Sequence, residues 1–319
     1  MARAGLLASA AALAKLHQGS LARCDAPPPS PAASLKGGTC PRSGLRYFAA
    51  RSRPPEASSC RSAALEALHA FALAESHGKD GGEAASKAAK ALPVLTARAF
   101  AEGVAQVPHW VWTGPDGALL EEEEAAARAW AEALSVAFAR CDEELGEEPV
   151  SAVLCIVARS GIYISSVGIS RCVIGTEADQ GDTVYCDEAS VPHDANNAAE
   201  LARVKDAGVA VVPPVLRFLG GRMRKASQPG LISLPDVVRA RHPLAGRCFV
   251  LLGTSNLWTK GPRLPVHWAV QAFREGSCPA SAWVRRAGVG EEDAAAMVLV
   301  LPPGLAEEDS PLPNHGDVT

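Results

Sequence analysis

Short apolar runs separated by polar turns recur along the chain and predict β-strands rather than long buried helices. The runs are Leu45–Ala50, a stretch within Ala63–Ala74 that ends in Phe71–Ala74, Val150–Val157, Gly161–Val167, Arg171–Gly175, Val209–Val212, Phe249–Leu252 and Met297–Leu301. None of these runs is long enough to span a bilayer. We expect Gly161–Val167 and Arg171–Gly175 to pair as a hairpin around a turn at Gly168.

Helical patterns lie between the groups of predicted strands. They cover Gly81–Leu92, Glu121–Gly146, Ala195–Ala207, His267–Glu275 and Pro279–Gly288. The acidic run at the start of Glu121–Gly146 suits the first turn of a helix better than a metal site. Because the strands come in groups and do not alternate regularly with helices, the pattern predicts an α+β fold with two antiparallel sheets covered by helices.

The two ends of the chain differ from this middle part. Residues 1–24 contain Arg3, Lys15 and Arg23 and no acidic residue, which resembles an organelle transit peptide. A secretory signal and an unstructured tail are the alternatives for this segment. Residues 25–43 are rich in Pro, Ser and Gly and predict a disordered linker, residues 44–303 a globular domain, and residues 304–319 a disordered polar tail.

Composition limits the classes of partner. The chain has 319 residues, is 48% hydrophobic and carries a formal charge of -4. Without a basic stripe we expect no nucleic-acid partner, and without an apolar span no membrane partner. Nine cysteines with no C-x-x-C spacing predict reduced, buried thiols in an intracellular compartment. The expected location is the mitochondrion or plastid if a transit peptide is present and the cytoplasm otherwise, and we expect a monomer.

Polar side chains follow or precede three of the predicted strands. Glu75 comes directly after Phe71–Ala74, Ser255 follows Phe249–Leu252, and Asp293 precedes Met297–Leu301. Carboxylates at strand ends are suitable ligands for divalent metals, although each turn alone is also consistent with ordinary polar residues. Arg171 can bind a phosphate or brace its own turn, and the bracing role is favoured.

In their order along the chain, several segments resemble the motifs of the PP2C (PPM-type) metal-dependent protein serine/threonine phosphatases. Phe71–Gly78 resembles a strand plus Asp-Gly-His-Gly, with Glu75 at the Asp, Ser76 at the first Gly, and His77-Gly78 retained. Leu252–Trp258 resembles Ala-Ser-Asp-Gly-Leu-Trp, with Ser255 at the Asp. The segment starting at Asp293 resembles Asp-Asn-Ile-Thr-Val-Val.

Three further segments resemble the same family. Val167–Arg171 resembles Val-Gly-Asp-Ser-Arg with Ile169 at the Asp, and Arg217–Gly221 resembles Arg-Ala-Phe-Gly-Asp with Gly221 at the Asp. Asp194–Gly208 resembles the Glu-x-x-Arg-Ile helix. The resemblance covers about residues 44–303 and implies a four-layer α-β-β-α sandwich of two antiparallel sheets flanked by helices.

The resemblance also implies a site. One or two Mg²⁺ or Mn²⁺ ions would be held by Glu75, Ser76 through its backbone carbonyl, Ser255 and Asp293, while Arg53 would bind the phosphate. This requires the three loops that carry Glu75, Ser255 and Asp293 to converge. Ser255 and Gly221 replace carboxylates, and losing one charge beside two dications costs several kcal/mol of attraction.

Two functions follow from this resemblance. The first is a weak or inactive pseudophosphatase that acts as a protein-binding module for a protein client. The alternative is an active Mg- or Mn-dependent phosphatase for phosphoserine and phosphothreonine in a phosphoprotein substrate. An unrelated enzyme with Ser255 as nucleophile is disfavoured, because no His/Asp pairing points to Ser255.

Overall fold

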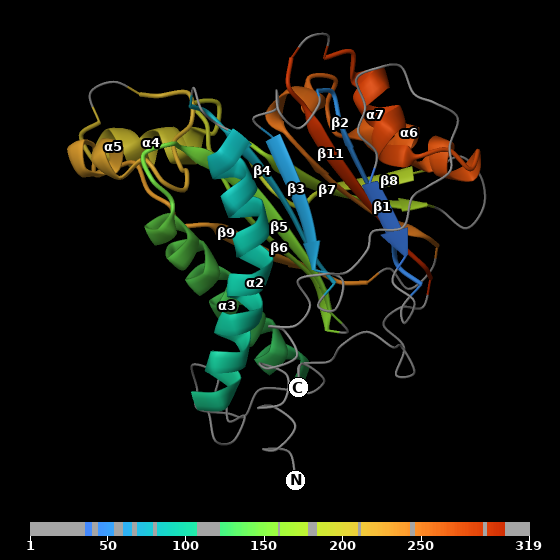
Figure 1. Ribbon diagram of the computed structural model, residues 1–319, viewed down its shortest axis with the longest axis horizontal. Helices are drawn as coiled ribbons and strands as arrows, with labels where there is room; N and C mark the ends of the chain where they lie inside the picture. The colour runs from blue at the N-terminus through green and yellow to red at the C-terminus, as the bar shows by residue number, and fades with distance from the viewer. Residues whose placement is uncertain are drawn as a thin grey trace.

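The chain folds as two antiparallel β-sheets with helices on their outer faces (Figure 1). The computed structural model describes residues 36–39, 44–53, 60–65, 69–78, 82–106, 122–158, 160–177, 184–209, 212–242, 246–289 and 292–303. The predicted α+β class and the sandwich implied by the resemblance are confirmed.

The first sheet, sheet A, has the strand order β1-β2-β11-β10-β7-β8. Its strands are β1 (Lys36–Thr39), β2 (Arg46–Arg51), β7 (Arg171–Glu177), β8 (Val184–Glu188), β10 (Cys248–Gly253) and β11 (Ala295–Leu301). The central strands β10 and β11 are buried along their whole length, in agreement with their continuous apolar sequences.

The second sheet, sheet B, has the strand order β3-β4-β5-β6-β9. Its strands are β3 (Cys60–Leu65), β4 (Ala70–Ser76), β5 (Val150–Ala158), β6 (Gly161–Val167) and β9 (Asp236–Ala240). The single strand predicted within Ala63–Ala74 is therefore two strands, β3 and β4, which pair with each other.

The predicted hairpin of Gly161–Val167 with Arg171–Gly175 is wrong. Strand β6 pairs with β5 and β9 in sheet B, whereas β7 pairs with β10 and β8 in sheet A. The chain crosses between the sheets at Gly168, whose φ of +88° suits glycine. A Cβ there would lie 2.0 Å from Ser151 Oγ, so close packing against β5 also requires glycine.

Three layers of core hold the sandwich together. Helices α2 (Gly82–Gln106) and α3 (Glu122–Glu144) pack on the outer face of sheet B around Trp130 and Phe138. The inner faces of the two sheets meet around Phe71 and Val250. Helices α6 (Arg263–Arg274) and α7 (Pro279–Ala287) cover the outer face of sheet A around Trp283.

Smaller helices lie at the ends of the sheets. Helices α4 (Ala198–Asp206) and α5 (Arg222–Ser227) lie beside one another, away from α6 and α7 (Figure 1), and η3 (Ser255–Trp258) follows β10. The strand predicted at Val209–Val212 is not present at Val209 or Val212, and residues 210 and 211 lie outside the described residues.

Within the segment predicted as linker, Lys36–Thr39 form β1 at the edge of sheet A, so that prediction is wrong for these four residues. Backbone pairing with β2 orders them even though their sequence has no apolar pattern. The segments 1–24 and 304–319 lie outside the described residues. The described cysteines are all free thiols, and most of them are buried. No described helix combines the length and apolar character of a membrane span.

Candidate functional site

Glu75 lies near the end of β4 with only 9% of its surface exposed. Its carboxylate accepts hydrogen bonds from the Ser255 backbone N–H at 3.1 Å and the Ser255 hydroxyl at 2.9 Å. A third, longer bond of 3.4 Å comes from the Ser170 hydroxyl. The described structure therefore surrounds Glu75 with neutral donors from two distant segments of the chain.

Hydrogen bonds between the β10 and β11 segments fix the position of Ser255. The Thr254 N–H donates to the Ala295 carbonyl, and the Ala295 N–H donates to Thr254 Oγ1, each at 3.1 Å. The Asn256 side-chain amide donates to the Asp293 carbonyl at 2.7 Å. These bonds hold the polar turn after β10 against the segment that precedes β11, so Ser255 and Asp293 lie at the same sheet end.

Charge around Glu75 is not balanced by a cation. Burial raises the pKa of Glu75, the hydrogen bonds from Ser255 and Ser170 lower it, and the neighbouring Asp293 carboxylate raises it further. No arginine or lysine among the described residues contacts Glu75. The three predicted loops thus meet at one place, while the metal-binding roles assigned to Glu75, Ser255 and Asp293 remain predictions.

Ser76 and Arg53 lie close to this site in the fold. Ser76 is the last residue of β4, is buried, and its hydroxyl accepts from the Gly78 N–H at 3.4 Å. Arg53 is half-buried just beyond β2, next to Ser52, which exchanges hydrogen bonds with the Glu292 carbonyl and the Ala294 N–H. Arg53 is therefore at the sheet end that carries Asp293, and its phosphate-binding role stays a prediction.

Two other positions at which the resemblance implies lost carboxylates lie in distinct surroundings. Gly221 begins α5 with a φ of +64°, donates to the Gly146 carbonyl, and would place a Cβ 2.6 Å from the Phe218 ring. Ile169 packs against a small apolar cluster that includes Phe218. An aspartate at either position would disturb the packing around Phe218.

Sequence reasoning missed Ser151 and Ser170. The Ser151 hydroxyl accepts from the Ile169 N–H at 3.0 Å and lies 2.6 Å from His77 Nε2. Burial, with a contribution from the positive Arg224, lowers the pKa of His77 to about 4, so its ring is neutral at physiological pH. Ser151 does not stand out in the sequence, and Ser170 lies in the segment that resembles Val-Gly-Asp-Ser-Arg but is given no role there. The crossing of the chain at Gly168 brings the two segments together.

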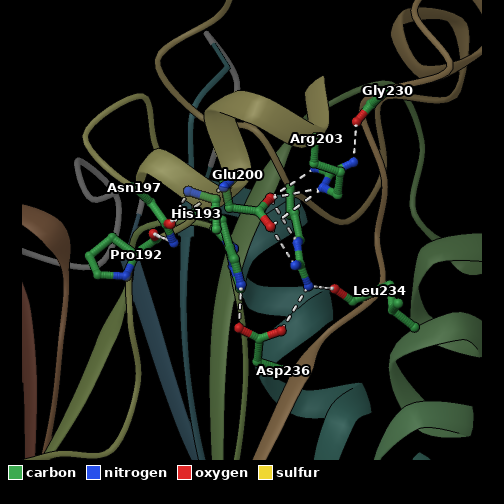
Figure 2. A network of polar contacts seen from close by, with 11 residues as sticks. Pro192, His193, Asn197, Glu200, Arg203, Gly230, Leu234 and Asp236 are labelled. Atoms are coloured by element: carbon green, nitrogen blue, oxygen red, sulfur yellow. Dashed lines mark hydrogen bonds and ion pairs between the residues drawn. The ribbon is translucent and has the colours of Figure 1, made fainter. Parts of the chain in front are cut away.

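A second polar cluster lies next to the crossing (Figure 2). His193 Nδ1 accepts from the Gly168 N–H at 3.1 Å, and Nε2 lies 2.9 Å from an Asp236 carboxylate oxygen. Arg217 donates to Asp236 and, through two nitrogens, to Glu200, which also accepts from Arg203. Burial raises the pKa of Glu200, but the two arginines more than offset this and hold it at about 2. This cluster is an ion-pair network that connects α4, β9 and the crossing.

A cavity of about 440 Å³ opens beside Ser255. The residues that line it include Arg171, Asp194, Asn196 and Trp258. Arg171 forms an ion pair with Glu188 and lies over the Trp258 ring at 5.7 Å. The site thus combines the buried Glu75 and the half-buried Asp293 with an adjacent cavity that carries a cationic side chain.

The residues present do not fit the two-ion centre that the resemblance implies. Hard divalent ions need several anionic oxygen ligands each. The described residues contain no group of three or more His, Cys, Asp and Glu side chains arranged to hold a metal. Glu75 and Asp293 supply only two carboxylates. The Ser255 hydroxyl donates a hydrogen bond to Glu75, whereas a metal ligand at this position would point its oxygen at the ion.

Comparisons with known proteins address the family. The family described as Protein phosphatase 2C matches residues 59–263. A search of curated proteins gives no match. Among solved structures, serine-threonine phosphatase 2C from Toxoplasma gondii is similar with a TM-score of 0.59 and 17% identity, over 86% of this chain and 97% of that chain.

A sex determining protein of C. elegans is similar with a TM-score of 0.55 and 15% identity, over 85% of this chain and 65% of that chain. At these identities the two structures establish the shared fold alone. The family match covers more than half of the chain and agrees with the sandwich and with the order of its motifs. The chain therefore belongs to the protein phosphatase 2C family.

Proposed function

We propose that this protein is a PP2C-fold pseudophosphatase that serves as a protein-binding module, with weak or no phosphatase turnover. One observation carries the proposal. Both oxygens of Glu75 accept hydrogen bonds from Ser255, the residue that stands where the family motif has an aspartate. A carboxylate whose lone pairs are engaged in this way is a poorer ligand for a bridging metal ion.

The charge of the site supports the same proposal. Two carboxylates, Glu75 and Asp293, cannot neutralise two dications, and a neutral hydroxyl adds no charge. In this family chemistry the metal ions generate the nucleophile and stabilise the phosphate oxygens. A site that fills poorly with metal at cellular concentrations therefore loses most of its rate.

The alternative is an active phosphatase with a modified metal site. The observation that favours it is the closeness of Glu75 and Asp293, which is sufficient for the charge of Asp293 to raise the pKa of Glu75. Two neighbouring carboxylates are a suitable place for a single Mg²⁺ or Mn²⁺ ion.

Calorimetry with Mn²⁺ and hydrolysis of a phosphoserine peptide at millimolar Mn²⁺ test the two functions. A pseudophosphatase shows neither a two-ion stoichiometry nor turnover. Turnover that is lost in both Glu75→Ala and Asp293→Ala would establish the alternative.

Substitution of Ser255 tests the placement of the site. Ser255→Asp restores a carboxylate beside Glu75 and is expected to raise Mn²⁺ affinity at least tenfold, about 1.4 kcal/mol. Ser135→Asp on α3 adds the same charge at another half-buried serine and is expected to leave Mn²⁺ affinity unchanged. Equal affinity in the Ser255→Asp and wild-type chains would show that the site is misplaced. Gly221→Asp is unsuitable, because its Cβ would clash with Phe218.

A further inference from the structure

The cavity beside Ser255 contains a guanidinium that is only partly paired. The Arg171 side chain is 18% exposed, and its ion-pair partner Glu188 is 44% exposed. Within the described structure, Arg171 Nε is buried and has no hydrogen-bond partner. An arginine has five donors, so the single ion pair with Glu188 leaves donor capacity on the Arg171 guanidinium, and Arg171 lines the cavity.

The backbone of Arg171 is held by sheet A. Arg171 is the first residue of β7, directly after the crossing held by His193 and Ser151. The guanidinium carbon lies 5.7 Å from the centre of the Trp258 ring, and Trp258 packs edge-on against Trp283 at 4.7 Å and donates to the Gly253 carbonyl. A guanidinium held against an aromatic ring loses little freedom on binding a ligand, which favours planar, bidentate recognition of an oxyanion.

The charges around the cavity favour a monoanion over a dianion. Asp194 lines the cavity, and Glu75 contacts Ser255, which also lines it. Arg171 is itself paired with Glu188, so its positive charge is partly offset while two carboxylates, Asp194 and Glu75, lie in the cavity wall or one residue behind it. A phosphate monoester with close to two negative charges is repelled more strongly here than a carboxylate with one.

The remaining walls are suited to an apolar neighbour of that carboxylate. Ile169, Pro192 and Pro214 supply apolar surface, and Val191 at the adjacent position is 55% exposed. A cavity of about 440 Å³ is in the size range of sites that bury a small ligand or side chain.

We infer that this cavity binds the carboxylate side chain of an unphosphorylated partner peptide, an Asp or Glu flanked by apolar residues, through Arg171 and without a metal ion. The inference rests on the proposed function, because it names the kind of client that a non-hydrolysing module of this fold would bind.

The test uses the full chain in EDTA and follows the Trp258 indole N–H by NMR. Three blocked peptides are titrated: Ala-Leu-Glu-Leu-Ala, its Gln counterpart and its phosphoserine counterpart. The Glu peptide is expected to bind at least about tenfold more tightly than the Gln peptide, since one charge-assisted bidentate contact is lost. Equal affinity for the Glu and Gln peptides, or tighter binding of the phosphoserine peptide, would overturn the inference.

Variants connect the binding to Arg171. Arg171→Ala is expected to weaken binding of the Glu peptide at least tenfold, and Asp194→Asn to strengthen it several-fold. Arg140→Ala, which removes an arginine paired with Glu102 on the far helices, is expected to have no effect. If the alanine variant does not fold, Arg171→Lys takes its place, because lysine keeps the positive charge and the aliphatic stem. Wild-type affinity for the Glu peptide in the lysine variant would contradict bidentate binding.

The outcomes separate this inference from the proposed function. Turnover of the phosphoserine peptide with Mn²⁺ would overturn the pseudophosphatase proposal. Absence of both turnover and Glu-peptide binding would overturn only the inference about the cavity.

Discussion

Two buried glutamates in this protein have opposite electrostatic surroundings. Glu200 is 4% exposed and Glu75 is 9% exposed, so burial alone disfavours the charged form of both. The arginines Arg217 and Arg203 hold the pKa of Glu200 at about 2. Burial and the Asp293 carboxylate raise the pKa of Glu75, which only hydroxyl and amide donors oppose.

The comparison separates a carboxylate in a structural ion-pair network from a carboxylate at the candidate site. Glu200 is compensated within the protein, so its network stabilises the native state and needs no ligand. Glu75 has a neighbouring carboxylate and neutral hydrogen-bond donors in place of arginines, so its charge is not compensated in the way that the charge of Glu200 is. A perturbed carboxylate near a cavity marks a functional site only when the protein itself leaves its charge unbalanced.

Among the variants considered, Arg217→Ala is expected to have the largest effect, because it removes one of the two arginines that compensate the charge of Glu200. It leaves Glu200 buried with Arg203 alone, and we expect a loss of about 3–5 kcal/mol in the free energy of unfolding. Urea denaturation measures it. Arg140→Ala, which breaks an exposed pair with Glu102, is the control and is expected to cost less than about 1 kcal/mol. Similar losses in both variants would contradict the structural importance of the network.

Gly168→Ala tests the connection between the two regions, because the Gly168 N–H bonds to His193 and the same crossing carries Ser170. The new Cβ would lie 2.0 Å from Ser151 Oγ and 2.9 Å from Ser151 Cα, in addition to the cost of a positive φ. We expect a destabilisation of about 2–4 kcal/mol, since a backbone contact cannot move aside easily.

Gly208→Ala provides the matched control for this change. Its φ of +77° is similar, but a Cβ at Gly208 meets nothing within 4 Å. The control isolates the backbone cost, about 1–2 kcal/mol. If both alanine variants lose the same stability by thermal denaturation, the close packing of the crossing on β5 is not significant.

The sequence predicted the buried parts of the fold better than its edges. Strands β10 and β11 are continuous apolar runs, and both lie where the pattern places them. Strands β8 and β9 are edge strands whose residues are exposed or half-buried, and their apolar runs are only two or three residues long, too short to identify a strand. The apolar pattern of β6 and β7 identifies both as strands but cannot say which sheet each joins.

The candidate site was predictable only through the resemblance. Glu75, Ser255 and Asp293 are each ordinary polar turn residues, and it is the order of the family motifs that relates them. The contact between Ser255 and Glu75 depends on the bonds that Thr254 and Asn256 make to the β11 segment, which no local pattern encodes. Ser151 and Arg171 become part of the site only because the chain changes sheets at Gly168.

Glu75→Gln sharpens the unbalanced side of the comparison through pH. The pKa of Glu75 is raised above its ordinary value of 4.5, so the folded state holds this proton to a higher pH than the unfolded state does. Stability contributed by the protonated group is present below pH 4.5 and is lost as pH rises through the folded-state pKa. Glutamine stays neutral, and the Ser255 hydroxyl can accept from its amide as readily as it donates to a carboxylate. We therefore expect a Tm close to that of the wild type at acidic pH and about 2 °C or more above it at neutral pH, measured by calorimetry in EDTA.

Added Mn²⁺ decides the meaning of the result: if millimolar Mn²⁺ raises the Tm of the wild type but not of Glu75→Gln, the carboxylate pair binds metal and the proposed loss of the centre is contradicted.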